Sequence, residues 1–447
     1  MYRKSNNIII IGGNAAGAAA AAQAKKQFPD KNIFLIEKSD YFSTGTCEIP
    51  LVISGELSKN DIVFFNPDTF YEKKGVKVLI KSEAKYIDTK SKVVKVLNLQ
   101  NGNEAHIDYD KLIIATGSKP NIPTEFSKKY SNLFFVKDVT NLDNLIEYLK
   151  NNIVKSVGIF GSGYIALEMA EAFKKLGKDV NIYHNVHYPE LFDDKDVNDF
   201  IEKLLLENEI NFIRYKNLTI LERDNKIDKI KLDNNIFSNE LYILATGFQP
   251  NSEIAVNSGL RLEQNSIFTD RYLKTSDKDI SAAGDCTHYY DFFTKKPIYL
   301  PFATFARFSA YAAVKNLYER NEPFPFVVKN SVVKIFDYFF LAIGLNNRDQ
   351  KQRGIFTRQI FEWHENKIHL IKDRKKNFVK LFVDNNNKIV GGYLIGGEEV
   401  TEMGNHIMTY IKLKLSYKNL EILNYNYSPQ CSNMINILYK ISKKERL

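Results

Sequence analysis

The apolar positions near the N-terminus predict a strand, a helix and a second strand. Asn7–Ile11 is a β-branched run without alternation, which is typical of a strand buried on both faces. The Ala-rich stretch Ala15–Gln27 favours a helix, and Pro29 marks its end. Ile33–Glu37 is apolar again and predicts the second strand. Together these elements predict a βαβ unit.

The turn between this strand and helix has the Gly-x-Gly-x-x-Gly spacing of a dinucleotide site. Gly12 and Gly17 hold its outer positions, and Asn14 stands at the middle one, where Asn tolerates the positive φ that a turn can demand. Such a turn aims free N–H groups and the helix dipole at a pyrophosphate. Glu37, about twenty residues further on, can accept the ribose hydroxyl protons. The alternative is an ordinary βαβ unit with a tight turn.

A second unit of the same kind begins at the strand Val157–Phe160. The sequence Gly161-Ser162-Gly163 and Ala166 give the spacing Gly-x-Gly-x-x-Ala, and the following helix is predicted to end near Leu176. Two such units in one chain indicate two dinucleotides. His184, at the end of the next strand, stands at the ribose position where an acid would favour NADH, so NADPH also remains open. The alternative for His184 is a surface residue at a strand end.

The rest of the chain is rich in strands. The alternating runs between the two units predict a β-meander, at Val76–Ile80, Ala84–Asp88 and Lys92–Asn98. Buried strands that end in the same Ala-Thr-Gly triplet are expected at Leu112–Ala115 and Leu241–Ala245. A strand at Ile280–Ala283 and a helix at Phe302–Tyr318 follow, and then strands at Ser331–Phe336, Phe339–Leu345, Phe356–Trp363, Phe378–Asp384 and Ile389–Ile395 and helices at Val400–Leu413 and Tyr417–Leu423.

The predicted fold class is α/β, with two Rossmann-like dinucleotide-binding domains and a C-terminal α+β domain. The first domain is expected to be discontinuous, at residues 1–118 and 246–325, and the second to span 119–245. Pro120 and Pro123 suit a linker that crosses between them. The C-terminal domain is expected at residues 326–447.

Composition narrows the class of protein. The hydrophobic content of 44% and charged content of 26% are those of a globular protein, and no apolar run has the roughly 20 residues that span a bilayer. No signal peptide is predicted. Three cysteines without a Cys-x-x-Cys pair exclude a disulfide framework and fit a reducing cytoplasm. The net charge of +9 is spread along the chain, which favours steering of small anions over nucleic-acid binding. The histidines show no metal-binding spacing.

A lone thiol follows the first βαβ unit. Cys47 lies ten residues beyond Glu37, and a helix that begins near it would stabilise its thiolate. A cysteine beside a dinucleotide ring suggests thiol redox chemistry, and the alternative is an inert buried cysteine. Cys286 and Cys431 are interpreted as packing residues.

The motifs, in this order, resemble those of the pyridine nucleotide-disulfide oxidoreductases over nearly the whole chain. They are the Gly12 turn with Glu37, the Gly161 turn with Glu168, the strand end Ala245-Thr246-Gly247, and Ala283-Gly284-Asp285. The resemblance implies that the first unit binds FAD and the second NAD(P)H. It also implies that the C-terminal domain forms a homodimer.

The resemblance also assigns cofactor-binding residues. The FAD site would comprise Gly12, Asn14, Gly17, Glu37, Lys38, Thr116, Gly117, Asp285, which would bind the ribityl chain, and Ala303. The NAD(P)H site would comprise Gly161, Gly163, Tyr164, Glu168, His184 and Gly247. In this interpretation Tyr164 covers the flavin until nicotinamide displaces it, and Glu168 orients the nicotinamide.

Cys47, with Ser43 four residues before it, is similar to the single-cysteine branch of the family, which includes coenzyme A-disulfide reductases, persulfide reductases and NADH oxidases. The oxidase members carry a histidine in the first glycine turn, which this chain lacks. The coenzyme A-disulfide reductases use residues that match Gln23, Lys26, Ser43 and Arg307, and a tyrosine that matches Tyr427 and reaches the partner's thiol. The chain is therefore expected to reduce coenzyme A disulfide or persulfide.

Three departures from that pattern leave the substrate open. Glu48 follows the cysteine where a small residue is usual, and its carboxylate would raise the thiol pKa unless it points away. Gln430 replaces a proline, and Met434 replaces a basic residue. An oxygen-reducing NADH oxidase and a flavin-bound redox sensor with little turnover remain as alternatives.

Overall fold

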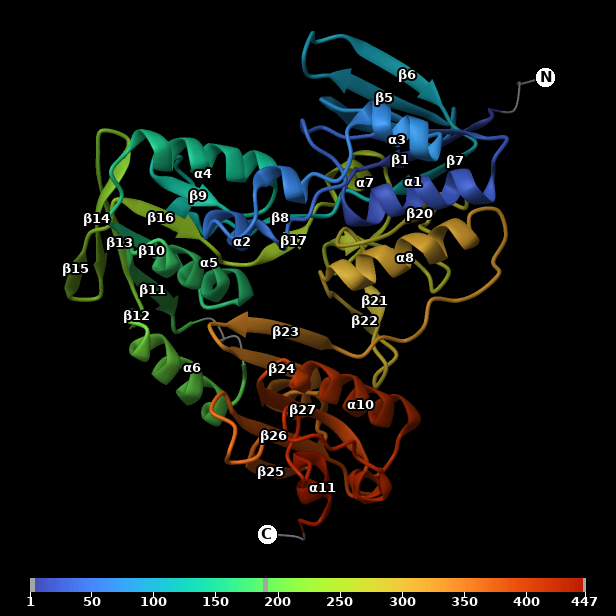
Figure 1. The fold of residues 1–447 in the computed structure, drawn as a ribbon. Coiled ribbons are helices and arrows are strands. Elements are labelled where there is room, and N and C mark those ends of the chain that lie inside the picture. Colours follow the sequence, from blue (N-terminus) through green and yellow to red (C-terminus); the bar gives the residue numbers. More distant parts are fainter. Residues whose placement is uncertain (1–4, 188–191, 445–447) are drawn as a thin grey trace. The chain divides into compact units, whose positions relative to one another are not determined.

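The computed structural model describes residues 5–187 and 192–444 (Figure 1). The chain forms two compact units. The first comprises Met1–Lys155, Ile220–Lys229 and Asn239–Val327, and the second Ser156–Thr219, Ile230–Ser238 and Val328–Leu447. Three chain segments therefore build each unit. The mixed α/β fold class is confirmed, whereas the division into three domains stays a prediction.

A five-stranded parallel sheet is the centre of the first unit. Its strand order is β20-β7-β1-β2-β3, with the bounds Ile280–Ala282, Lys111–Ile114, Asn7–Ile11, Asn32–Ile36 and Lys77–Leu79. The register aligns Ile8 with Ile33 on one side and with Lys111 on the other. The strands β1, β2, β7 and β20 lie within one or two residues of the predicted bounds, because buried β-branched runs specify them strongly.

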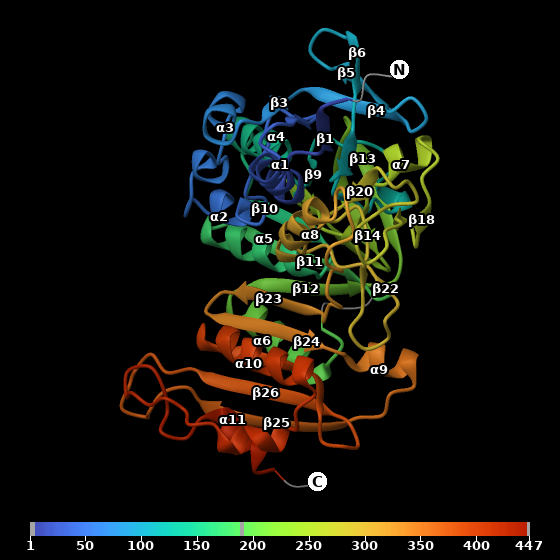
Figure 2. The same ribbon diagram turned by 90° about the vertical axis from the view of Figure 1, so that its right-hand side faces the viewer.

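Both faces of this sheet are covered. Ile8 and Ile10 face the helices α1 (Ala15–Gln27) and α8 (Ala303–Lys315), which lie side by side in Figures 1 and 2. Ile9 and Ile11 pack on the opposite face, against apolar residues of a small antiparallel sheet and of α7 (Glu253–Asn257). The alanines of α1 let its backbone come close to the sheet, because their side chains are small. α1 was predicted with these bounds, and α8 ends three residues before the predicted Tyr318.

The β-meander was predicted with one wrong strand. Val76–Ile80 contributes β3 to the parallel sheet, where Val78 pairs with Leu35. The third strand of the meander is instead β6 (Glu104–Asp108), which pairs with β5 (Val93–Asn98), and β5 pairs with β4 (Ser82–Asp88). β6 is mostly exposed and polar, so its sequence carries no apolar alternation that would reveal it.

The two segments that follow the Ala-Thr-Gly triplets pair with each other. β8 (Ser118–Pro120) and β17 (Phe248–Pro250) follow the two triplets and pair antiparallel. The Thr116 hydroxyl donates to the Asn251 carbonyl at 2.6 Å, and the Thr246 hydroxyl donates to the Asn121 carbonyl at 2.6 Å. Each threonine therefore fixes the segment that follows the other triplet.

The first unit contains further elements. They are α2 (Ile49–Ile53), η1 (Lys59–Ile62), α3 (Pro67–Lys74), η2 (Thr124–Phe126), β9 (Leu133–Phe135), α4 (Val139–Asn151), β16 (Leu241–Leu244), β18 (Leu262–Glu263), β19 (Ser266–Ile267), β21 (Tyr289–Tyr290) and β22 (Pro297–Ile298). The helix expected to begin near Cys47 is confirmed as α2, two residues beyond the sulfur.

The second unit begins with the second βαβ motif. Its parallel strands β10 (Ser156–Phe160), β11 (Asp179–Asn185) and β12 (Ile210–Tyr215) pair in sequence order, and α5 (Tyr164–Lys175) and α6 (Lys195–Glu207) connect them. α5 ends near Leu176 as predicted, and Gly177 follows this C-cap residue at a φ of 70°. The next strands along the chain are β13 (Leu218–Arg223), β14 (Lys226–Leu232) and β15 (Asn235–Phe237), and the stretch Ile220–Lys229 within them belongs to the first unit.

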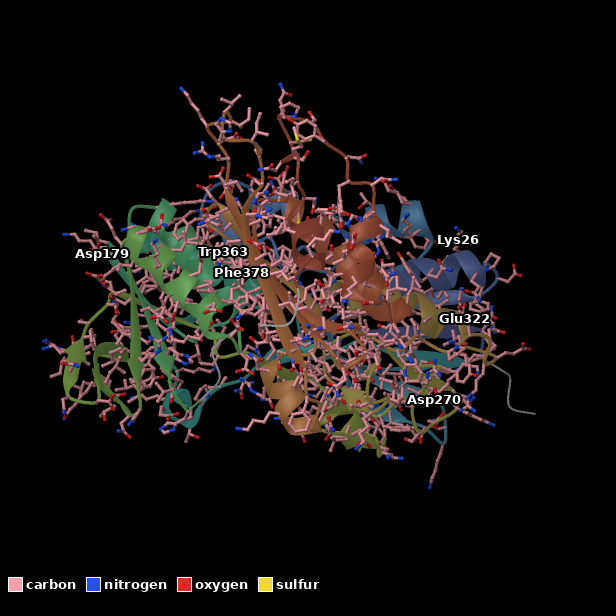
Figure 3. All side chains as sticks on the ribbon, turned by 90° about the horizontal axis from the view of Figure 1, so that it is seen from below. Lys26, Asp179, Asp270, Glu322, Trp363 and Phe378 are labelled. Carbon is pink, nitrogen blue, oxygen red and sulfur yellow. The ribbon has the colours of Figure 1, made fainter. Side chains whose placement is uncertain are left out.

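A five-stranded antiparallel sheet forms the C-terminal part of this unit. Its order is β23-β24-β27-β26-β25, with the bounds Asn330–Ile335, Tyr338–Gly344, Ile389–Gly396, Lys376–Val383 and Arg358–Glu365. The register aligns Trp363 with Phe378, and their ring centroids lie 4.5 Å apart (Figure 3). Phe378 in turn aligns with Ile395, and Ile395 with Phe340. One apolar row therefore crosses the sheet.

The C-terminal helices are α9 (Asn347–Arg353), α10 (Glu399–Leu413) and α11 (Ile437–Ser442). The predicted α-helix at Tyr417–Leu423 is a 3-10 helix, η3 (Tyr417–Ile422). Within the described residues, every helix is too short or too polar to pass through a lipid bilayer.

Lys274 provides a test of the first unit. Its side chain is buried, its ammonium donates to the Leu317 carbonyl at 2.6 Å, and burial lowers its pKa to about 8 from 10.5. The unfolded chain binds the proton more tightly, so the native state loses stability as the pH falls from about 10 to below 8.

The wild-type protein should therefore lose up to about 3 kcal/mol of unfolding free energy between about pH 10 and about pH 6. The Lys274→Met variant should not lose this amount, so its stability relative to the wild type should rise by that much as the pH falls. Urea denaturation at both pH values measures this difference, with the exposed Lys278→Met as the matched control. Equal differences for the two variants would contradict the burial argument.

Candidate active site

The first glycine turn is closed tightly by the helix that follows it. Gly12 has a φ of 102°, and a Cβ on it would lie 2.2 Å from the Ala115 carbonyl oxygen. A Cβ on Gly17 would lie 1.7 Å from the Gly12 carbonyl oxygen. Any side chain at either position would force the backbone apart. The two outer glycines therefore hold the N-terminus of α1 against the turn, as a pyrophosphate site demands.

Glu37 points its carboxylate at this turn. The side chain is 9% exposed, Oε2 accepts the Gly13 N–H at 2.7 Å, and Oε1 accepts the Ser39 N–H at 2.9 Å. Each oxygen retains a further acceptor site, because an ionised carboxylate accepts about four hydrogen bonds. Glu37 is thus already oriented for hydroxyl donors, while the neighbouring Lys38 is exposed.

Asn14 differs from its sequence-based expectation. Its φ is −88°, so the positive φ that was expected of it is wrong. Its side-chain oxygen instead accepts hydrogen bonds from Thr44, at 2.8 Å from the hydroxyl and 3.3 Å from the backbone N–H. Asn14 therefore joins the glycine turn to the loop that carries Cys47.

The Cys47 loop is tied to two further parts of the unit. The Ser43 N–H donates to the Gly13 carbonyl at 2.8 Å, and Ser43 has a φ of 50°. The Gly45 N–H donates to the Ile62 carbonyl at 2.8 Å. Cys47 itself is exposed. These bonds hold the backbone before Cys47 to the first dinucleotide turn on one side and to Ile62 on the other, and the Cys47 side chain is exposed.

Glu48 folds back over this loop. A Cβ on Gly45 would lie 2.5 Å from the Glu48 carboxylate oxygen Oε2 and 3.1 Å from the Phe64 ring. A Cβ at position 45 would force the carboxylate out of this place. The carboxylate therefore takes the space above Gly45, a contact that the residue spacing alone did not reveal.

Asp285 lies in a buried polar cluster. The Ser118 hydroxyl donates to Asp285 Oδ2 at 3.0 Å, and Lys137 Nζ donates to Ser118 Oγ at 2.8 Å. Burial raises the pKa of Asp285, while Lys137 and Ser118 act to lower that pKa. The Tyr299 hydroxyl is also buried, and burial and the charge of Asp285 raise its pKa, while a contact with Ser118 acts to lower that pKa. A buried hydroxyl in the neighbourhood of Asp285 fits the hydroxyl-rich ribityl chain that the resemblance implies.

Sequence reasoning missed Lys137 and Tyr299, because neither belongs to a motif. The predicted residues Thr116 and Gly117 lie in the connection between β7 and β8, and Gly247 lies in the matching connection between β16 and β17. Ala303 is exposed at the first position of α8. The residues around the first turn therefore fit a flavin dinucleotide.

The second glycine turn leaves space for a ligand. Gly161 has a φ of 118°, and Gly163 has a φ of −80°, which any residue can adopt. No atom lies within 4 Å of a Cβ built on Gly163. The glycine is not needed by the protein's own packing, and its open side is a cradle that a pyrophosphate can fill.

Tyr164 and Glu168 lie on one face of α5. Tyr164 is the first residue of the helix, and its hydroxyl donates to Ser331 Oγ in β23. Burial, and then the charge of Glu171, raise the pKa of Glu168 to about 7 from 4.5. Glu168 therefore changes its charge near neutral pH, next to the open turn.

His184 contacts the second glycine turn through Ser162. The side chain is buried, and Nδ1 lies 2.9 Å from the Ser162 hydroxyl. Its ring also stacks near Phe212. The proposed contact of His184 with a ribose stays a prediction, and no carboxylate occupies its place at the end of β11.

The predicted anion-binding residues lie on the neighbouring helices α1 and α8. A Cβ on Gly284 would contact Ala16 and Ala306, and Phe28 packs on Tyr318, so the two helices run parallel. Arg307 is therefore level with the start of α1, whereas Lys26 lies roughly 13 Å further along the helix axis. Gln23 is half-buried, and Lys26 is exposed (Figure 3).

Arg307 and Tyr427 lie at the surface, whereas the two other cysteines differ in burial. The Arg307 Nε donates to the Tyr311 hydroxyl at 2.9 Å. Tyr427 is 45% exposed in the second unit, in the segment before α11. Cys431 is exposed and Cys286 is fully buried, where burial raises the pKa of the Cys286 thiol to about 11. Only Cys286 is the packing residue that was expected.

Comparisons with known proteins agree with this geometry. A model of the pyridine nucleotide-disulphide oxidoreductases matches residues 6–305, and a model of their dimerisation domain matches residues 331–438. The NAD(P)H sulfur oxidoreductase (CoA-dependent) of Pyrococcus furiosus is 29% identical over 379 residues, which are 84% of this chain and 85% of the relative. An NADH oxidase of Methanocaldococcus jannaschii is 28% identical over 412 residues, 91% of each chain.

A solved structure of an NAD-dependent persulfide reductase from A. fulgidus matches with a TM-score of 0.91 and 26% identity, covering 98% of this chain and 82% of the other. The first family model alone covers more than half of the 447 residues. This chain therefore belongs to the pyridine nucleotide-disulphide oxidoreductase family.

Proposed function

We propose that this chain uses NAD(P)H to reduce coenzyme A disulfide or a coenzyme A persulfide through Cys47. The overall reaction for the disulfide consumes NAD(P)H and one proton and yields NAD(P)⁺ and two thiols. FAD, when bound, takes up two electrons from NAD(P)H and passes them to a disulfide. The single observation that carries the proposal is the pair of links, Ser43 to Gly13 and Thr44 to Asn14, that hold the Cys47 loop on the first dinucleotide turn.

The sulfur of Cys47 would act as the nucleophile. As a thiolate it attacks one sulfur of the coenzyme A disulfide, which forms a Cys47–coenzyme A disulfide and releases one coenzyme A thiolate. That thiolate takes a proton. The two electrons and one proton that the hydride of NAD(P)H supplies would then cleave the mixed disulfide, which restores the Cys47 thiolate and releases the second coenzyme A thiol. The start of α2, two residues beyond Cys47, favours the anionic sulfur.

Other residues of the chain would hold the reactants. Glu37 would accept ribose hydroxyls of FAD, and Asp285 would bind the ribityl chain beside Tyr299. Glu168, next to the Gly163 cradle, would orient the nicotinamide. Tyr427, on the dimer partner, would donate a proton to the leaving thiolate.

Coenzyme A suits the spacing of the basic residues. Its thiol and its phosphates stand at opposite ends of a long molecule. Arg307 lies level with the start of α1, where Asn14 holds the Cys47 loop, and Lys26 lies roughly 13 Å further on. Lys26 would therefore bind distal phosphates, and Arg307 would bind nearer the thiol. The Pyrococcus furiosus relative is named for coenzyme A dependence, which supports this choice.

A homodimer forms part of the proposal. The dimerisation-domain model matches residues 331–438, and this region exposes large apolar side chains. Phe356 is 85% exposed, Ile422 75% and Met434 72%. Burying such residues against a second copy would remove apolar surface from water.

A second candidate function is the reduction of oxygen. The Methanocaldococcus jannaschii relative is named an NADH oxidase. Asn14 and Ala15 leave the first turn without the imidazole that would act on a sulfenic acid at Cys47. The disulfide reaction is therefore preferred.

The Cys47→Ser variant tests the proposed function. We expect NAD(P)H to bleach the flavin of this variant under anaerobic conditions, because that step does not need the thiol. Turnover of coenzyme A disulfide should fall by about a thousandfold or more, because the nucleophile is lost. Cys431→Ser is the control and should retain activity. Retained disulfide turnover in Cys47→Ser would reject the proposal, and surviving oxygen consumption would favour the oxidase.

The Gly163→Val variant tests the nucleotide cradle. The backbone angles at this position suit valine and the space beside it is open, so we expect the melting temperature and flavin content to be unchanged. The KM for NAD(P)H should rise by about tenfold or more, because the new side chain fills the pyrophosphate space. Gly163→Ala should give a smaller rise. An unchanged KM for both variants would place the nucleotide elsewhere.

The double variant Lys26→Ala/Arg307→Ala tests the coenzyme A assignment. The KM for coenzyme A disulfide should rise by about tenfold, because two charges facing phosphates are lost. The KM for small polysulfides, which lack phosphates, should not change. Steady-state kinetics with both substrates measure the difference. A parallel rise for both substrates would exclude a phosphate-binding role.

A further inference from the structure

Asp143 of α4 accepts hydrogen bonds from both ends of the segment that carries Cys47. Tyr41 precedes the sulfur, and Lys59 follows α2 at the start of η1. The Tyr41 hydroxyl donates to Asp143 Oδ2 at 2.8 Å, and Lys59 Nζ donates to Asp143 Oδ1 at 2.8 Å. Each oxygen of the Asp143 carboxylate therefore holds one end of the segment.

The two ends also contact one another. Lys59 Nζ donates to the Tyr41 hydroxyl at 3.2 Å and lies 5.3 Å from the centre of the Tyr41 ring. The hydrogen bonds to Asp143 and to Tyr41 raise the pKa of Lys59, so the ammonium remains charged. The three side chains form a closed triangle across a stretch of 18 positions in the sequence.

Backbone bonds already join the two sides of the loop, from the Gly45 N–H to the Ile62 carbonyl and from the Phe64 N–H to the Ser43 carbonyl, and the triangle adds a side-chain link from both ends to α4. The bonds from Ser43, Thr44 and Gly45 fix the backbone before the sulfur. After the sulfur, α2 buries Ile49 and Ile53 and packs beside α4. Asp143 is the side chain that joins the beginning of the segment, its end and α4 at one point.

This arrangement contributes little to overall stability. The side chains of Lys59 and Asp143 are 36% and 34% exposed, and ion pairs with this exposure stabilise a fold by less than about 1 kcal/mol. A contact with a small effect on unfolding can still decide where a loop atom lies, because a displacement of about 1 Å strongly slows a reaction between positioned groups.

We propose that Asp143 is a positioning residue for Cys47, which clasps Tyr41 and Lys59 and thereby fixes the sulfur relative to the first dinucleotide turn. The inference rests on the proposed function, because it assigns Asp143 to the step in which Cys47 reacts. Asp143 does not touch the reacting atoms and acts only through the loop. No sequence motif indicates this contact, since the three residues are separated by up to 102 positions.

The test compares Asp143→Ala with Glu147→Ala in the flavin-loaded full-length protein. Glu147 is an exposed carboxylate one turn further along α4, so its removal controls for the loss of charge on this helix. We expect Asp143→Ala to slow the reoxidation of the reduced protein by coenzyme A disulfide about tenfold. The rate at which NADPH bleaches the flavin and the flavin content should match those of the control.

A second readout does not depend on turnover. The rate of Cys47 alkylation by iodoacetamide, measured against pH in a Cys431→Ser background, reports how the loop presents the thiol. Asp143→Ala should change this rate severalfold, and Asp143→Asn, which keeps one acceptor oxygen and so can serve only one arm, should partly restore it. A residue that merely supported the fold would lower flavin content and both half-reactions together.

The two arms give an independent check. Tyr41→Phe and Lys59→Met each remove one hydrogen bond to Asp143. The double variant should show the same slower reoxidation and altered alkylation as Asp143→Ala. It therefore replaces Asp143→Ala in the test if that variant does not fold. The proposal is overturned if Asp143→Ala equals Glu147→Ala in reoxidation and alkylation, or if the two arm variants together leave both rates unchanged. Failure of the proposed function is seen separately, as disulfide turnover that survives Cys47→Ser.

Discussion

Hydrogen bonds between a glycine turn and a loop organise the chemistry of the first unit. α1 comes so close to its own turn that a methyl group on Gly17 would overlap the Gly12 carbonyl. This contact sets where Gly13 and Asn14 present their oxygens, and those oxygens receive the N–H of Ser43 and the hydroxyl of Thr44. The position of Cys47 is thus inherited from the packing of a helix on a sheet. A loop alone would not hold a sulfur so closely.

The two dinucleotide turns show that one backbone geometry can serve different ends. Gly12 and Gly161 both have φ above 100°, and the residues two positions later, Asn14 and Gly163, both have φ near −80°. At Gly163 the space beside the backbone is left to a ligand. At Asn14 a side chain joins the turn to the neighbouring loop. The φ at the middle position does not require glycine. The residue found there instead follows from what lies beside it, which is the Thr44 hydroxyl at Asn14 and open space at Gly163.

Much of the fold was predictable because long apolar runs leave few alternatives. The strand Asn7–Ile11 and the helix Ala15–Gln27 were placed to the residue, and a helix was expected near Cys47, where α2 begins. The meander was harder, since β6 exposes most of its side chains and β3 is too short to reveal its partner. For the site, motif residues such as Glu37 and Glu168 could be named, but their roles stay predictions. Asp143, Lys137 and Tyr299 could not be found, because only tertiary contacts bring them to their partners.

The fold-back of Glu48 onto Gly45 links two residues whose side chains compete for one space. A side chain larger than glycine at position 45 would force the Glu48 carboxylate to move, and a shorter residue 48 would leave room for that side chain. The same reasoning joins Asn14 to Thr44, since either alone would leave a half-buried polar group without its acceptor or donor. Among homologous chains these two pairs should vary together, so the loop and the turn are bound to diversify as a single evolutionary unit.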